Sequence, residues 1–100
     1  NEKEALYHFY WQLLVGDTAD NIKGCIGIGA VKAGKFLDEN AEECHWFETC
    51  RRLYNNDEEL TLNAKLLWIL REEPPDGIWS LSKTITRLGL EALSESTTST

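Results

Sequence analysis

The feature that most constrains the fold is a pattern over residues 22–37, in which a glycine hairpin, Gly27-Ile28-Gly29, separates two apolar segments. Glycine tolerates positive φ and lets another backbone or a ligand come close. The small Ala33 would sit on the second helix, and the other apolar positions are Ile22, Cys25, Phe36 and Leu37. We predict a helix-hairpin-helix over about residues 18–38, with Ile28 packed in the core between its two helices.

The predicted second helix, from Gly29 to about residue 38, would follow the hairpin directly. The start of a helix presents unpaired N–H groups and the positive end of its dipole, which favour anions. No acidic residue occurs between Asn21 and Leu37, and such a surface would hold nucleic-acid phosphates without reading sequence. The alternative is an ordinary glycine turn between two helices. The candidate DNA-binding residues are Lys23, Gly24, Gly27, Ile28, Gly29, Lys32 and Lys35.

Two carboxylates, Asp17 and Asp20, come just before this pattern. We predict one short helical turn over residues 17–22, and a spacing of three would then place both side chains on one side. Paired oxygen ligands of this kind suit Mg²⁺ or Mn²⁺. The alternative is that Asp17 caps a short helix and Asp20 is a solvated acid of its first turn.

The order Gly16-Asp17-x-x-Asp20-Asn21-Ile22-x-Gly24, followed by the hairpin, resembles the structure-specific 5′-nuclease family. That family includes phage flap endonucleases, 5′–3′ exonucleases and the 5′-nuclease domain of bacterial DNA polymerase I. The apolar lead-in over residues 9–15 is also similar to the preceding helix of phage-type members. The resemblance covers about residues 6–37, and it departs from the family at Lys23, where proline is usual.

The resemblance implies that Asp17 and Asp20 help to hold the second of two catalytic Mg²⁺ or Mn²⁺ ions. It also implies that residues 24–29 grip duplex or flap DNA independently of sequence, with a K⁺ ion on the hairpin carbonyls. Two-metal phosphodiester hydrolysis needs further carboxylates, which the family carries on an N-terminal nuclease domain. We therefore expect the chain to be the C-terminal part of a longer nuclease of a bacterial or phage-infected cytoplasm, and to be inactive alone.

Charge argues in part against this assignment. The 100-residue chain has a net charge of −7, whereas nucleic-acid-binding domains are usually basic. Its only positive segment is residues 21–37, with three lysines and no acid. Two alternatives therefore stay open. One is a non-catalytic helix-hairpin-helix module that only binds duplex DNA. The other is a helical protein-interaction domain, suggested by the acidic surface and the four tryptophans.

The remaining segments predict one all-α domain over residues 1–93, a small bundle of five or six helices. Further helices are expected over residues 2–15, 41–54, 58–71 and from Ser80 or Ser82 to about 93, with 58–71 as the central one. A Pro-Pro linker spans 72–77, and the polar tail 94–100 is expected to be disordered. The three cysteines lack zinc-site spacing and are expected to be reduced thiols. No apolar run is long enough to span a membrane.

Overall fold

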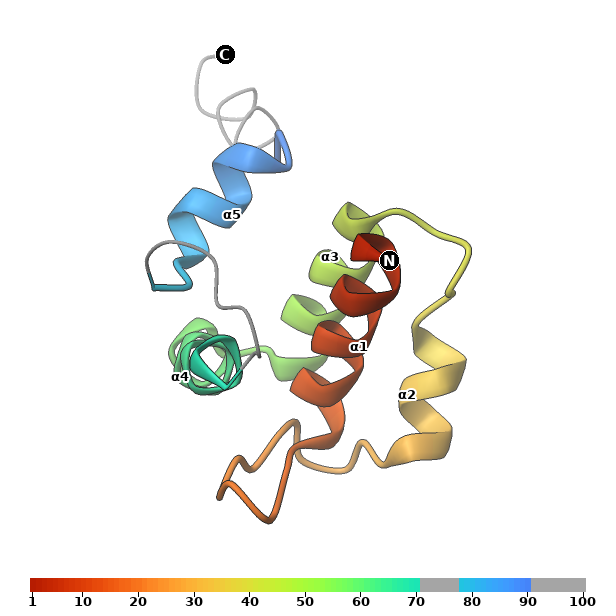
Figure 1. Ribbon diagram of the computed structural model, residues 1–100, viewed down its shortest axis with the longest axis vertical. Helices are drawn as coiled ribbons and strands as arrows, with labels where there is room; N and C mark the ends of the chain where they lie inside the picture. Colours follow the sequence, from red (N-terminus) through yellow and green to blue (C-terminus); the bar gives the residue numbers. More distant parts are fainter. Residues whose placement is uncertain (71–77, 91–100) are drawn as a thin grey trace.

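The computed structural model describes residues 1–70 and 78–90, which form five α-helices and no strands (Figure 1). The helices are α1 (Glu2–Val15), α2 (Ala30–Phe36), α3 (Glu43–Tyr54), α4 (Asp57–Ile69) and α5 (Leu81–Arg87). The prediction of an all-α fold is confirmed. None of these helices is both long and apolar enough to cross a membrane. The predicted linker over 72–77 and the predicted tail over 94–100 lie outside the described residues.

Helix α1 is the centre of the bundle, because α2, α3 and α4 all pack against it. The Asn1 side chain caps its first turn by accepting a hydrogen bond from the Glu4 N–H at 2.8 Å. Gly16, with φ of 84°, ends it. Its fully buried residues include Leu13 and Leu14. We expected the helix over 58–71 to be central, but α4 buries only one side, and Leu62 and Ile69 on its other sides are exposed.

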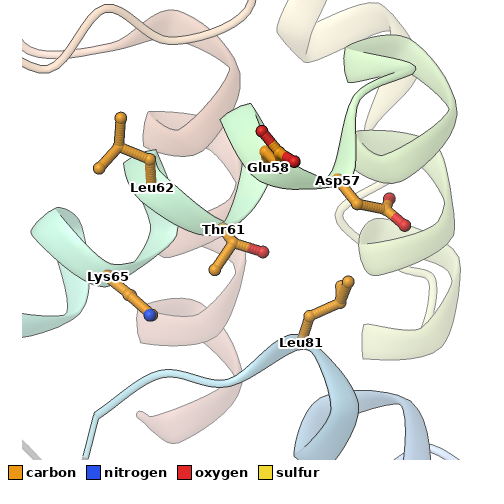
Figure 2. A pocket seen from close by; sticks show the side chains of 6 residues that line it. All are labelled: Asp57, Glu58, Thr61, Leu62, Lys65 and Leu81. Carbon is orange, nitrogen blue, oxygen red and sulfur yellow. The ribbon is translucent and has the colours of Figure 1, made fainter.

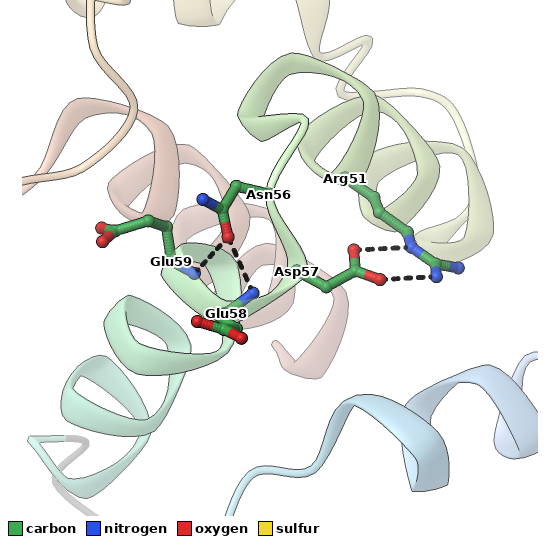
Figure 3. Close-up of polar contacts among 5 residues, drawn as sticks. All are labelled: Arg51, Asn56, Asp57, Glu58 and Glu59. Atoms are coloured by element: carbon green, nitrogen blue, oxygen red, sulfur yellow. Dashed lines mark hydrogen bonds and ion pairs between the residues drawn. The ribbon is translucent and has the colours of Figure 1, made fainter.

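A tight connection joins α3 to α4 (Figure 3). Asn55 takes the left-handed conformation at the end of α3, and the Asn56 side chain then caps α4 by accepting the N–H groups of Glu58 and Glu59. The Arg51 guanidinium forms two hydrogen bonds with the Asp57 carboxylate, at 3.0 and 2.9 Å.

Helix α5 is held to the bundle by apolar packing, by a buried tryptophan and by an ion pair. Trp79, just before the helix, is buried against Phe47 of α3. The Arg87 guanidinium binds both carboxylate oxygens of Glu43, at 2.8 and 2.7 Å, and Glu43 also accepts a hydrogen bond from the Tyr10 hydroxyl. Ser80 caps the helix, as one of the two predicted serines. The helix ends at Arg87 instead of continuing to about 93, since the chain turns at Gly89 with φ of 74°.

No helix-hairpin-helix is identified, because its first helix does not form. Residues 17–22 make a turn closed by an antiparallel bridge between Asp17 and Ile22, and residues 23–29 are not helical. Positive φ at Asn21, Gly24 and Gly27 interrupts any helix here. The predicted helical turn over 17–22 was therefore wrong. Only the second helix is present, as the seven-residue α2, shorter than predicted.

The apolar positions of the pattern are nevertheless mostly buried. Four of them are buried in the core: Ile22, Cys25, Ala33 and Leu37. Ile28 is half-buried and packs against the core, whereas Phe36 is 40% exposed. The pattern therefore predicted which side chains face inward more accurately than it predicted the backbone that carries them.

Candidate functional site

The candidate site is carried by a loop that leaves the end of α1 and returns to begin α2 (Figure 1). The ends of its first part, Gly16 and Gly24, lie against each other. A Cβ on Gly16 would lie 2.6 Å from the carbonyl oxygens of Ile22 and Lys23, and a Cβ on Gly24 would lie 2.6 Å from the Gly16 nitrogen. Between them, Asp17 and Ile22 exchange two backbone hydrogen bonds of 2.8 Å each. The first part of the loop is therefore closed by its own backbone.

Two side chains from the helices hold this closed segment in place. Asn63 of α4, which is 3% exposed, accepts a hydrogen bond from the Gly24 N–H at 3.1 Å. Its own amide donates to the Glu59 carbonyl at 2.9 Å. Gln12 of α1 donates from Nε2 to the Gly16 carbonyl at 2.8 Å. Sequence reasoning identified neither residue, and the only signal for Asn63 was a polar residue inside an apolar helix.

The segment brings Asp17 and Asp20 to one pocket of about 220 Å³. Asp17 is half-buried and accepts the Ala19 N–H at 3.1 Å, while Asp20 is exposed. The pKa of Asp20 is raised above its ordinary value by the side-chain hydrogen bond that its protonated carboxyl donates to Asp17 and by the charge of the Asp17 carboxylate. The other lining residues are Ala5, His8, Phe9, Gln12, Leu67 and Leu70.

These carboxylates fit part of a metal site. Carboxylate oxygens suit Mg²⁺ or Mn²⁺, and a cation between them would offset the repulsion that raises the pKa of Asp20. Among residues 1–70 and 78–90, however, no three His, Cys, Asp or Glu side chains are grouped so that they could hold a metal ion. Asp17 and Asp20 could therefore supply only some of the ligands, and the others would have to come from elsewhere.

The second part of the loop is open. Lys23, at the end of the closed segment, and Lys32 and Lys35 of α2 are exposed, and within the described part of the chain no carboxylate pairs with them. A Cβ on Gly27 or Gly29 would meet nothing within 4 Å, so a ligand could approach the backbone closely at both positions. Three exposed lysines and two accessible glycines thus lie within residues 23–35, which we call the lysine segment.

The other two predicted DNA-binding residues lie beneath the surface of the lysine segment. Gly24 is buried, and its N–H is already bonded to Asn63. Ile28 is half-buried against the core, and its N–H donates to the Cys25 carbonyl at 3.1 Å. Both residues therefore shape the loop, while the lysines and the outer glycines remain accessible.

A second hollow of about 450 Å³ lies between α4 and α5 (Figure 2). It is a shallow groove lined on the α4 side by Asp57, Glu58, Thr61, Leu62 and Lys65 and on the α5 side by Leu81. Asp57 is already engaged by Arg51, and the Arg51 guanidinium lowers the pKa of the Asp57 carboxyl. No arrangement of nucleophile and base is present among these lining residues.

Comparison with known proteins gives no assignment. No protein-family model matches the chain, and neither the curated proteins nor the solved structures contain a significant match. The function is therefore inferred from the geometry and chemistry of the residues themselves.

Proposed function

We propose that the chain is the DNA-gripping helical part of a Mg²⁺-dependent 5′–3′ exonuclease or flap endonuclease. One observation carries the proposal. The paired carboxylates Asp17 and Asp20 and the exposed Lys23 lie on one loop, whose first part is closed by the contact between Gly16 and Gly24. The loop leads directly into α2, which carries the exposed Lys32 and Lys35. A backbone closed in this way would keep a metal-binding group and a phosphate-binding surface at a fixed separation, as cleavage near a gripped duplex requires.

In this proposal, each part of the loop has a distinct task. Lys23, Lys32 and Lys35, with backbone N–H groups near the outer glycines, hold duplex phosphates independently of sequence. A K⁺ ion on hairpin carbonyls would add to that grip. Asp17 and Asp20 hold one Mg²⁺ or Mn²⁺ ion together with carboxylates of an N-terminal nuclease domain. The ion would supply Lewis-acid stabilisation of the phosphodiester's developing charge.

The first experiment is a Mn²⁺ titration of the isotopically labelled chain, read by paramagnetic broadening of its amide signals. We expect broadening centred on Asp17 and Asp20, and its loss in the double variant Asp17→Asn/Asp20→Asn. Broadening confined to the acidic residues between 38 and 60 would instead indicate diffuse attraction of cations. That result would contradict the metal-binding part of the proposal.

The second experiment measures binding of a duplex oligonucleotide as salt is raised. We expect affinity to fall with salt, because phosphate contacts release counterions. The purified chain with Mg²⁺ should not hydrolyse DNA, since its ligand set is incomplete. Turnover that survives Asp17→Ala would contradict the nuclease assignment.

Two other functions each have one observation in their favour. A non-catalytic DNA-binding module is favoured because no third potential metal ligand groups with Asp17 and Asp20 among the described residues. It predicts that Asp17→Asn/Asp20→Asn leaves nuclease activity of the full-length protein unchanged. A protein-interaction domain is favoured by the exposed apolar side chains of Leu62, Leu66 and Ile69 on α4. It predicts no salt-dependent binding of DNA.

A further inference from the structure

Ile26 is 99% exposed, the most exposed large apolar side chain in the described residues. It does not lie on a frayed end. The Ile28 N–H donates to the Cys25 carbonyl and closes a four-residue turn, in which Gly27 takes φ of 82° at the third position, as a type II turn requires. Cys25 and Ile28, on either side, pack into or against the core. The turn is thus anchored, and it holds Ile26 out in solvent.

The surroundings of Ile26 indicate what would cover it. Lys23, Lys32 and Lys35 are the charged residues between Asn21 and Leu37, and all three are exposed, whereas Asp17 and Asp20 lie earlier on the same loop. Val31, at the start of α2, is also 75% exposed. A partner that fits must be strongly anionic and must also offer an apolar surface close to its charges. The minor groove of a nucleic-acid duplex has this character, since deoxyribose edges line it and phosphates run along both rims.

We propose that Ile26 is an apolar contact residue that enters the minor groove while the neighbouring lysines hold the phosphates at its rim. This inference rests on the proposed DNA binding and adds to it a residue that carries no charge. The open backbone at Gly27 and Gly29 supports the close approach that such a contact needs, because no side chain there would keep the duplex away.

An anionic membrane surface would attract the same lysines but suits this loop less well. Helices that bind in the membrane interface present a long apolar face opposite a polar one. Here α2 has only seven residues, and the exposed large apolar side chains are Ile26 on the loop with Val31 and Phe36 at opposite ends of α2. These separate side chains form no long apolar face, so a contact through Ile26 fits a narrow groove better than an extended bilayer surface.

The test is fluorescence anisotropy with a mixed-sequence duplex, starting from low salt, on the unmodified chain and four variants. Ile26→Ser should lower affinity by roughly five- to ten-fold, by removing buried apolar area. It should leave the dependence on salt unchanged, because an apolar contact releases no counterion. Lys32→Ala should instead lower the slope of log affinity against log salt by about 0.9. Ile26→Leu should retain affinity, and Leu62→Ser, an exposed apolar control on α4, should bind like the unmodified chain.

The outcomes separate this inference from the proposed function. Salt-dependent binding that Ile26→Ser does not weaken would overturn the role of Ile26 and leave the proposed DNA binding intact. Absence of salt-dependent binding by the unmodified chain would overturn both. Binding to phosphatidylserine vesicles that Ile26→Ser abolishes, without any binding to DNA, would assign the exposed turn to a membrane and overturn the inference. Unchanged circular dichroism of Ile26→Ser would confirm that its effect does not come from unfolding.

Discussion

Two neighbouring stretches of the chain, the first part of the loop after α1 and the segment that runs from the loop into α2, use glycine for opposite purposes. Over residues 16–24, the missing side chains make room for the chain's own backbone, since a Cβ on Gly16 or Gly24 would lie 2.6 Å from backbone atoms. Over residues 27–34, the missing side chains of Gly27, Gly29 and Gly34 leave open space. The first stretch is closed upon itself and fixes the carboxylates. The second is left accessible, as a surface that binds a ligand must be.

The largest effect that this comparison predicts is that of Gly24→Ala. The new Cβ would collide with the backbone of Gly16 and would also have to accept φ of 75°. Overpacking against rigid backbone and the strain of positive φ together should lower the free energy of unfolding by about 3 kcal/mol or more. Urea denaturation measures the loss.

Gly29→Ala is the matched control for this change. Gly29 has a φ of −94° and open space around it, so its substitution should change stability by less than about 0.5 kcal/mol. Equal losses of unfolding free energy in Gly24→Ala and Gly29→Ala would show that the closed and the open stretch do not differ in the space around their glycines.

The next effect in size concerns the contact between the closed stretch and α4. Asn63→Ala removes the acceptor of the buried Gly24 N–H, and an unsatisfied buried donor costs about 2 kcal/mol. The loss should appear in urea denaturation, with shifted amide signals at Gly24. Leu62→Ala, at the neighbouring exposed position, should cost less than about 0.5 kcal/mol. If Asn63→Ala lowers the free energy of unfolding no more than Leu62→Ala does, the hydrogen bond from Gly24 to α4 does not stabilise the loop.

Much of the fold could be predicted because helix periodicity and helix caps depend on residues that are close together in the sequence. The first helix was predicted with the bounds that α1 has, and Ser80 was one of two predicted caps of α5. The loop was mispredicted as a helix because the spacing of apolar residues predicts which side chains are buried but does not determine the backbone conformation that carries them. Ile22 and Cys25 reach the core from a turn as well as they would from a helix.

The candidate site likewise has some features that the sequence predicts and others that it does not. The lysines and the pair Asp17 and Asp20 are evident from the sequence, because charge and spacing identify them without a structure. The hydrogen bond from Gly24 to Asn63 joins residues 39 positions apart. Such a contact leaves no local pattern, so the residue that positions the loop could be found only once the packing of α4 was known.

An intermediate effect is expected for Gly27→Ala. The position has φ of 82° but open space, so the substitution adds backbone strain without a collision. The expected loss is about 1 to 2 kcal/mol, smaller than for Gly24→Ala. Gly27→Asn should lose less than Gly27→Ala, because asparagine tolerates the left-handed region better. A loss as large as that of Gly24→Ala would mean that space at Gly27 is restricted after all.

Gly34→Ala should change stability in the opposite direction. Gly34 lies inside α2, has no positive φ, and a Cβ there would meet open space. Alanine favours the helix over glycine, so the free energy of unfolding should rise by about 0.5 to 1 kcal/mol. Thermal or urea denaturation would detect it. A loss of stability would show that something packs on this face of α2.

The smallest effect on stability is expected for Asp17→Asn, and its main readout is the pKa of Asp20. The hydrogen bond and charge of Asp17 raise that pKa in the folded chain, so folding becomes less favourable as pH rises through the interval between the ordinary and the raised value. Asp17→Asn removes the charge and should return the pKa of Asp20 towards its ordinary value, in a titration followed by carboxyl carbon NMR. A pKa that stays raised would mean that the two carboxylates do not interact, and their joint role in holding a cation would lose its support.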